Sequence, residues 1–210
     1  MSSSLTPPIA SPVTSSTSRV GALCGVLAGL LIALPALVEA FTGETTATSV
    51  PLGLSPAFAL PLLTALQLRQ RPATGRFAEV AHIVNLIGLG LFGAAAFASN
   101  LVLFYFDDHV IDEVLTGPTI PALIGCAAVF AVGCALFGAA MIRARVFPAI
   151  PAWGYAVVLP LFAFLTGLSD SLLTSGLHIL VGAILIWLSA ALWRMARDAQ
   201  HATSPARVSV

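Results

Sequence analysis

The sequence predicts an all-α fold, a polytopic transmembrane bundle of six spanning helices with both termini on the cytoplasmic side. Of its 210 residues, 58% are apolar and only 9% are charged. A soluble domain carries about 25% charged residues, so this composition excludes a soluble globular enzyme. Nine arginines balance nine acidic residues, and this neutrality gives no reason to expect a nucleic-acid partner.

Both ends of the chain are predicted to be disordered tails. Residues 1–18 are rich in Ser, Thr and Pro and carry no charge, a composition typical of disorder. Residues 198–210 are predicted to form a second tail on the cytoplasmic side. The transmembrane domain is therefore expected to comprise residues 19–197.

Six apolar runs lie between these tails. A spanning helix needs about 17–25 mostly apolar residues, which the first, fourth and sixth runs supply easily. The third run is long enough to span with a tilt or to protrude. The second and fifth are short and contain proline, but neighbouring helices can satisfy the backbone groups that proline frees. In order, the runs are residues 20–41, 52–68, 77–106, 120–142, 150–168 and 172–193.

Arginine placement supports six spans. With this partition all nine arginines fall on one side of the membrane, and dropping any single span would move some of them across. Cytoplasmic loops carry an excess of basic residues, so we expect a multi-pass protein of the cell membrane with both termini inside. The arginines are Arg19, Arg69, Arg71, Arg76, Arg143, Arg145, Arg194, Arg197 and Arg207, and the acids expected outside are Glu44, Asp107, Asp108, Asp112, Glu113 and Asp170.

An alternative concerns the first run. Arg19, Pro35 and the small residues around 38–40 resemble the features of a secretory signal peptide. The apolar stretch is longer than the usual 7–15 residues, which favours a retained helix. Cleavage of residues 1–40 would leave five spans and a new N-terminus outside.

The fourth run predicts close helix packing, because small residues allow helices to approach in lipid. We expect this stripe to pack inside the bundle, with a dimer face as the alternative. The stripe consists of Ala127, Ala131, Ala135 and Ala139, with Gly133 and Gly138 in the same run. Aromatic residues expected to anchor the membrane interface are Trp153, Tyr155 and Trp193.

The last third of the chain carries a resemblance. The sequence RARVFP at residues 143–148, followed by PAWG at 151–154, resembles the inner loop of many small actinobacterial membrane proteins. The final run, with His178, Gly182, Trp187 and Trp193-Arg194, is also similar to theirs. These proteins form a broad group of uncharacterised, roughly six-span proteins. The resemblance implies a fold and a membrane compartment, and it brings no catalytic residues with it.

Polar residues at the inner end of the third run form one candidate site. Glu79, His82 and Asn85 are spaced by three, which places them on one broad helical face. They could form an inner polar pocket. Alternatively, Glu79 lies in the headgroup zone, where an acid in a first helical turn is favoured by the helix dipole.

A second candidate site lies near the outer boundary. Asn100 and His178 are each six residues inside a predicted span, roughly 9 Å below the boundary. Lipid offers polar side chains no partner at that depth, so they should turn inward. We predict an outward-opening vestibule lined by Glu39, Asn100 and His178, with Asp170 at its rim. A purely structural polar cluster is the alternative.

The acidic loop at residues 107–113 could bind a divalent cation, since it holds four carboxylates beside His109. The apolar spacing favours a short interfacial helix instead, with Asp107 as its N-cap and Gly117-Pro118 at its end. We therefore expect no metal and no cofactor.

Three functions remain open, because no phosphate loop, GxSxG or HExxH motif is present. The favoured one is an accessory protein that binds a lipid, a hydrophobic small molecule or a membrane partner. The others are an enzyme acting on an isoprenoid-type substrate by acid catalysis and a small proton-linked transporter. A deep cavity lined by carboxylates would favour the enzyme, a continuous polar path would favour transport, and a dry, closed bundle would favour the accessory role. The catalytic residues and the oligomeric state stay open.

The predicted topology can be tested by labelling single cysteines in a background without Cys24, Cys126 and Cys134. A membrane-impermeant maleimide added to intact cells should label positions in 42–50 and 107–117, because these loops lie outside. Positions in 70–75 should stay unlabelled until the cells are lysed. Labelling of 70–75 in intact cells would contradict six spans.

Overall fold

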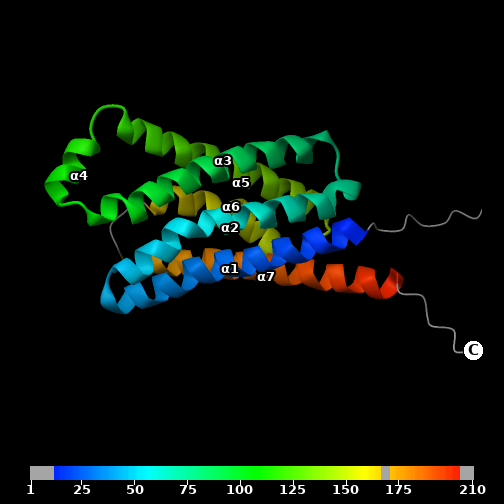
Figure 1. The fold of residues 1–210 in the computed structure, drawn as a ribbon. Helices are drawn as coiled ribbons and strands as arrows, with labels where there is room; N and C mark the ends of the chain where they lie inside the picture. Colours follow the sequence, from blue (N-terminus) through cyan, green and yellow to red (C-terminus); the bar gives the residue numbers. More distant parts are fainter. Residues whose placement is uncertain (1–11, 167–170, 204–210) are drawn as a thin grey trace, which may run out of the picture.

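The computed structural model describes residues 12–166 and 171–203, and this part of the chain is helical throughout (Figure 1). The predicted all-α fold is confirmed. The elements are α1 Pro12–Thr42, α2 Thr46–Gln70, the 3₁₀ turn η1 Arg71–Ala73, α3 Arg76–Leu101, the 3₁₀ turn η2 Leu103–Tyr105, α4 Asp108–Val114, α5 Thr119–Ala144, α6 Ala149–Leu165 and α7 Leu172–Thr203.

Five helices are long and apolar enough to cross a membrane, namely α1, α2, α3, α5 and α7. The sixth apolar helix, α6, has 17 residues, a length of roughly 26 Å. That is somewhat less than the hydrocarbon thickness of about 30 Å. The predicted fifth span therefore corresponds to a shorter helix among the described residues.

The short helix in the acidic loop is confirmed. α4 begins directly after Asp107, whose backbone is extended as an N-cap requires, although its carboxylate makes no capping hydrogen bond. Gly117 has φ +57°, a left-handed conformation that glycine adopts without strain. This glycine ends the segment before α5 starts at Thr119.

Both terminal helices extend beyond the predicted tail boundaries. α1 already begins at Pro12, and α7 continues to Thr203. Their ends are held together, because the Arg19 guanidinium donates to the Gln200 amide oxygen and lies over the Trp193 ring, 5.6 Å from its centroid. Sequence composition cannot reveal a partner from the opposite end of the chain. Residues 1–11 and 204–210 lie outside the described part.

The six long helices form a closed ring. Each packs against the next along the chain, in the order α1, α2, α3, α5, α6, α7, and α7 returns to pack along α1. Figure 1 shows α1 and α7 side by side. Because the ring closes, its interior is bounded by all six helices.

Charges separate to the two ends of this ring. The ends of the described chain lie together at one end of the bundle, and α4 lies at the other (Figure 1). Every described arginine belongs to a helix end or connection on the side of the termini. The acids of the α1–α2 turn and of α4 lie at the opposite end, which we call the acidic end.

Glycines bring the backbones of α3, α5 and α6 into direct contact. A Cβ added to Gly133 would lie 2.5 Å from the Asn85 Cα, and one on Gly138 would lie 2.5 Å from the Ala156 Cα. The predicted alanine stripe is only partly correct, since Ala131 is buried but Ala135 is exposed. A four-residue step turns about 40° beyond a full turn, so the stripe does not stay on one face.

We expect Gly133→Ala to lower stability by about 1–3 kcal/mol, because the added methyl group overpacks the contact with α3. Gly125→Ala is the matched control on the same helix, since nothing lies within 4 Å of its Cβ. Alanine favours a helix by about 1 kcal/mol over glycine, so the control should be neutral or stabilised. Unfolding of both variants in mixed micelles measures the difference, and equal stability would contradict the close approach.

Candidate functional site

A cavity of about 670 Å³ lies within the ring and reaches the acidic end. Small-molecule pockets have volumes of about 300–1,000 Å³. Its lining on α2 runs from Leu52 to Leu66, roughly 21 Å along the helix. The space is therefore deep enough for an extended hydrocarbon chain.

The lining changes character with depth. Leu66, Tyr155 and Leu185 line the deep part, far from the acidic end of their helices. Charged and amide groups line only the part near the acidic end. These groups are Glu39, Glu44, Asn100, Asp108 and His178, and the hydroxyl residues Ser55, Ser99 and Thr166 also line the cavity.

The structure brings three of the four predicted vestibule residues to this one cavity. Glu39, Asn100 and His178 come from α1, α3 and α7, and each is half-buried. Asp170 lies outside the described residues. Because lipid tails offer polar side chains no hydrogen-bond partner, the sequence alone could predict that these side chains face the interior. That they form a functional site stays a prediction.

Local hydrogen bonds orient two of these side chains. The Asn100 amide Nδ2 donates to the Ala96 carbonyl oxygen at 2.9 Å. His178 Nδ1 lies 2.8 Å from the Thr174 carbonyl oxygen. A carbonyl only accepts, so Nδ1 carries the proton in this contact. Each side chain is thus fixed by the preceding turn of its own helix.

An aromatic row forms one wall of the cavity. Phe92 of α3 stacks on Phe130 of α5 with ring centroids 4.5 Å apart, and it meets Phe162 of α6 at 5.9 Å. Phe162 in turn meets the His178 ring edge-to-face at 4.8 Å. The row joins α3, α5, α6 and α7, and all four side chains line the cavity. The sequence analysis did not find this wall, because the rings come from four separate helices.

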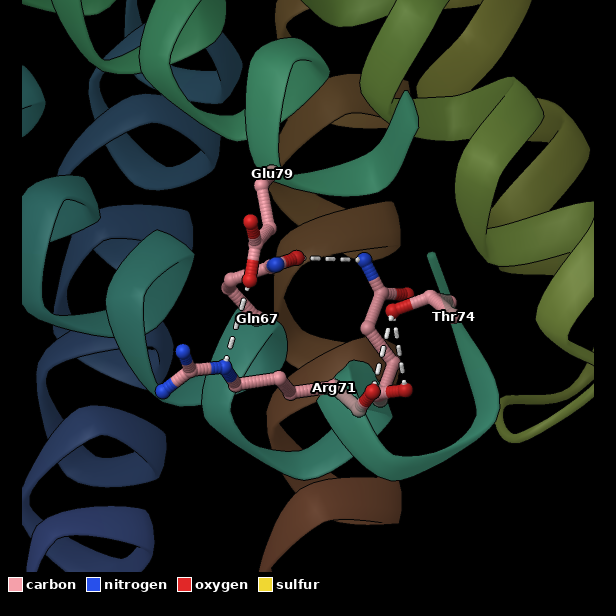
Figure 2. A network of polar contacts seen from close by, with 5 residues as sticks. Gln67, Arg71, Thr74 and Glu79 are labelled. Carbon is pink, nitrogen blue, oxygen red and sulfur yellow. Dashed lines mark hydrogen bonds and ion pairs between the residues drawn. The ribbon is translucent and has the colours of Figure 1, made fainter. Parts of the chain in front are cut away.

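The predicted inner pocket is divided among different environments. Glu79 is exposed and its carboxylate lies 3.4 Å from Arg71 Nε (Figure 2). His82 is half-buried against the Phe137 ring, with centroids 5.9 Å apart. Asn85 is fully buried and does not line the cavity. A three-residue spacing falls about 60° short of a full turn, so the three side chains spread around α3.

Asn85 belongs to a buried polar cluster that includes Tyr155, which was predicted to lie at the membrane interface. Its Nδ2 donates to the Tyr155 hydroxyl at 2.7 Å, and the Cys134 thiol donates to its Oδ1 at 3.4 Å. The prediction of Tyr155 as an interface anchor is wrong, since only 4% of it is exposed. Tyr155 lies six residues into α6, roughly 9 Å along the helix, and this depth could have predicted a buried side chain. Trp153, by contrast, is 57% exposed.

Two buried glutamines near the arginine end were missed by the sequence analysis. Gln70 Nε2 donates to Gln67 Oε1 at 2.9 Å (Figure 2). The Thr74 hydroxyl donates to the Gln70 and Arg71 carbonyl oxygens at 3.2 and 3.4 Å. These bonds shape the connection from α2 to α3. The feature that could have predicted the buried glutamines is a pair of amide side chains three residues apart at the end of an apolar run.

No protein family matches the chain, and no curated protein or solved structure is similar to it. The described residues contain no group of three or more side chains that could hold a metal ion. The fold defines a class, a helical membrane-embedded protein. Within that class, function has to be argued from the cavity.

We expect Tyr155→Phe to destabilise the protein by roughly 0.6–1.7 kcal/mol, the range measured for hydrogen bonds between membrane helices. The substitution keeps the ring beside Phe137 but leaves the buried Asn85 amide without its acceptor. Tyr105→Phe is the control, because Tyr105 is the only other tyrosine and is 54% exposed. Equal unfolding midpoints for the two variants in mixed micelles would show that the bond adds nothing.

Proposed function

We propose that this chain is a multi-pass protein of the cell membrane that binds an amphipathic, lipid-like molecule. The apolar tail would occupy the deep part of the cavity, and the head group would lie at the acidic end. One observation carries this proposal: the cavity is apolar in its depth, while its charged side chains gather at one end. An amphiphile has the same arrangement, an apolar chain with a polar head group at one end.

The proposed topology has six spans, with the arginine end in the cytoplasm and the cavity open to the outside. The ring supports it, because α6 lies between α5 and α7 and leaves their arginines at one end. Tilting of neighbours or local thinning of the bilayer accommodates a short span. The packing of α1 along α7 supports a retained first helix. Membership in the small actinobacterial group fits this topology and is part of the proposal.

The described interior favours binding over transport. Beyond the cavity, Phe137, Met141, Leu188 and Leu192 are fully buried and apolar. The buried amides of Gln67 and Asn85 are engaged with side chains of the protein. A continuous polar path from the cavity to the arginine end is therefore not supported by the described residues.

Acid catalysis on an isoprenoid-type chain is the second candidate. The observation in its favour is that the Glu39 carboxyl and the rings of Phe92 and Phe162 line the same cavity. A carboxylic acid can protonate a double bond, and aromatic faces stabilise the resulting cation. Product formation separates this candidate from simple binding.

The binding proposal is tested by filling the cavity. Ala96 lines it, and Ala94, two residues earlier on α3, is exposed and does not. Ala96→Trp should weaken binding of a fluorescent single-chain amphiphile in nanodiscs by roughly 5- to 150-fold, which corresponds to overpacking of about 1–3 kcal/mol. Ala94→Trp is the matched control and should bind like the parent protein.

Equal affinity of both tryptophan variants for the amphiphile would contradict ligand binding in this cavity. The enzymatic alternative is tested by mass spectrometry of an isoprenoid amphiphile after incubation with the protein. An isomerised, cyclised or hydrated product that Glu39→Gln abolishes would support the enzyme, because the cation formed by protonation must lose a proton or add water, whereas recovery of unchanged amphiphile would support binding alone.

A further inference from the structure

We infer that the head group of the ligand is a cation, an amine or a quaternary ammonium attached to an apolar chain. This inference rests on the proposed function and names the chemical class of its ligand. It is carried by two features of the same cavity, the sign of its charges and the aromatic faces among them.

The charged side chains that line the cavity are acidic. Glu39 comes from α1, Glu44 from the turn before α2 and Asp108 from α4. Two of them lie at the α1–α2 connection and the third on α4, so the carboxylates come from more than one part of the chain. A cationic group entering this end would meet opposite charge from several directions.

No arginine lines the cavity, and the chain has no lysine. The described arginines lie at the other end of the ring, and Arg207 is outside the described residues. A phosphate, sulfate or carboxylate head group would therefore meet like charges without an arginine or lysine partner. Repulsion of like charges grows as water is excluded, so the cavity disfavours anionic lipids and diphosphates.

Aromatic rings lie among these carboxylates. Phe162 meets His178 edge-to-face at 4.8 Å, and both line the cavity with Phe104 and Phe106. Aromatic faces attract cations through the ring quadrupole, and quaternary ammonium groups are recognised in this way. A quaternary ammonium has no N–H group to donate, so rings and surrounding carboxylates suit it better than a hydrogen-bonding site would.

One of these carboxylates, Glu44, takes part in the structure at the start of α2. The Ser49 hydroxyl donates to the Glu44 carboxylate at 2.6 Å, and Ser49 is fully buried at the start of α2. Removing the charge of Glu44 would therefore also disturb the start of α2. The test positions are therefore Glu39 of α1 and Asp108, which is exposed on α4.

The test compares three amphiphiles with the same dodecyl chain: dodecyltrimethylammonium, a dodecyl glucoside and dodecanoate. Each competes below its micelle concentration with a fluorescent amphiphile for the protein in nanodiscs of uncharged lipid. The cationic compound should bind about tenfold more tightly than the glucoside, the combined size of one cation–π contact and one partly exposed ion pair. Dodecanoate should bind most weakly, and added salt should reduce the preference for the cation.

Glu39→Gln should remove much of the preference for the cation over the glucoside, because it removes one of the carboxylates that line the cavity. Glu113→Gln is the matched control, because Glu113 is exposed on α4 and does not line the cavity. It should keep the full preference. If Glu39→Gln does not fold, Asp108→Asn provides the same comparison and should lower the preference severalfold.

The two proposals fail differently. Equal binding of all three compounds, or tightest binding of dodecanoate, overturns the cationic head group but leaves the cavity as a binding site. The cationic inference is also overturned if Glu39→Gln and Asp108→Asn both keep the parent preference. The proposed function itself is overturned if the parent protein binds none of the three compounds and if Ala96→Trp and Ala94→Trp have the same affinity for the fluorescent amphiphile.

Discussion

Direct contact between helix backbones is the constraint on which this fold depends. Lipid removes the hydrophobic driving force between helices, so close van der Waals packing has to supply it. Gly29 and Gly182 close the ring, since a Cβ on either would lie within 2.6 Å of the other's carbonyl oxygen. Gly133 and Gly138 likewise allow α5 to approach α3 and α6 closely. The first and last helices can therefore meet, and six helices enclose one interior.

Aromatic side chains form one wall of the cavity within that ring. Where glycine and alanine face each other, the backbones touch and little interior space is left. On the cavity wall, Phe92, Phe130 and Phe162 lie between the helices in place of small residues. These rings line the cavity although the backbones of α3 and α5 touch at this level, since a Cβ on Gly88 would lie 2.6 Å from the Phe130 Cα. The same rings line the cavity that the carboxylates line at the acidic end, which links the packing of the bundle to its proposed ligand.

Local sequence determined the class of fold and the direction of several polar side chains. Apolar runs and sparse charge predicted an all-α membrane protein, because only helices satisfy their own backbone groups in lipid. Asp107 marked the start of a short helix, because N-cap positions favour particular residue types, whereas the helix ends at Val114, before the predicted Gly117. Asn100 and His178 were expected to face the interior, and they line the cavity. Each inference needed only one segment of chain and the properties of the bilayer.

Tertiary structure alone decided which side chains meet. The Tyr155 hydroxyl is buried because Asn85 of α3 and Cys134 of α5 face it. Ala135 is exposed although Ala131, one turn earlier, is buried. Arg19 of α1 meets Gln200 and Trp193 of α7, residues from the opposite end of the chain. These outcomes depend on the rotation of each helix about its axis and on the identity of its neighbour, and both are set by packing among distant segments, not by local residue pattern.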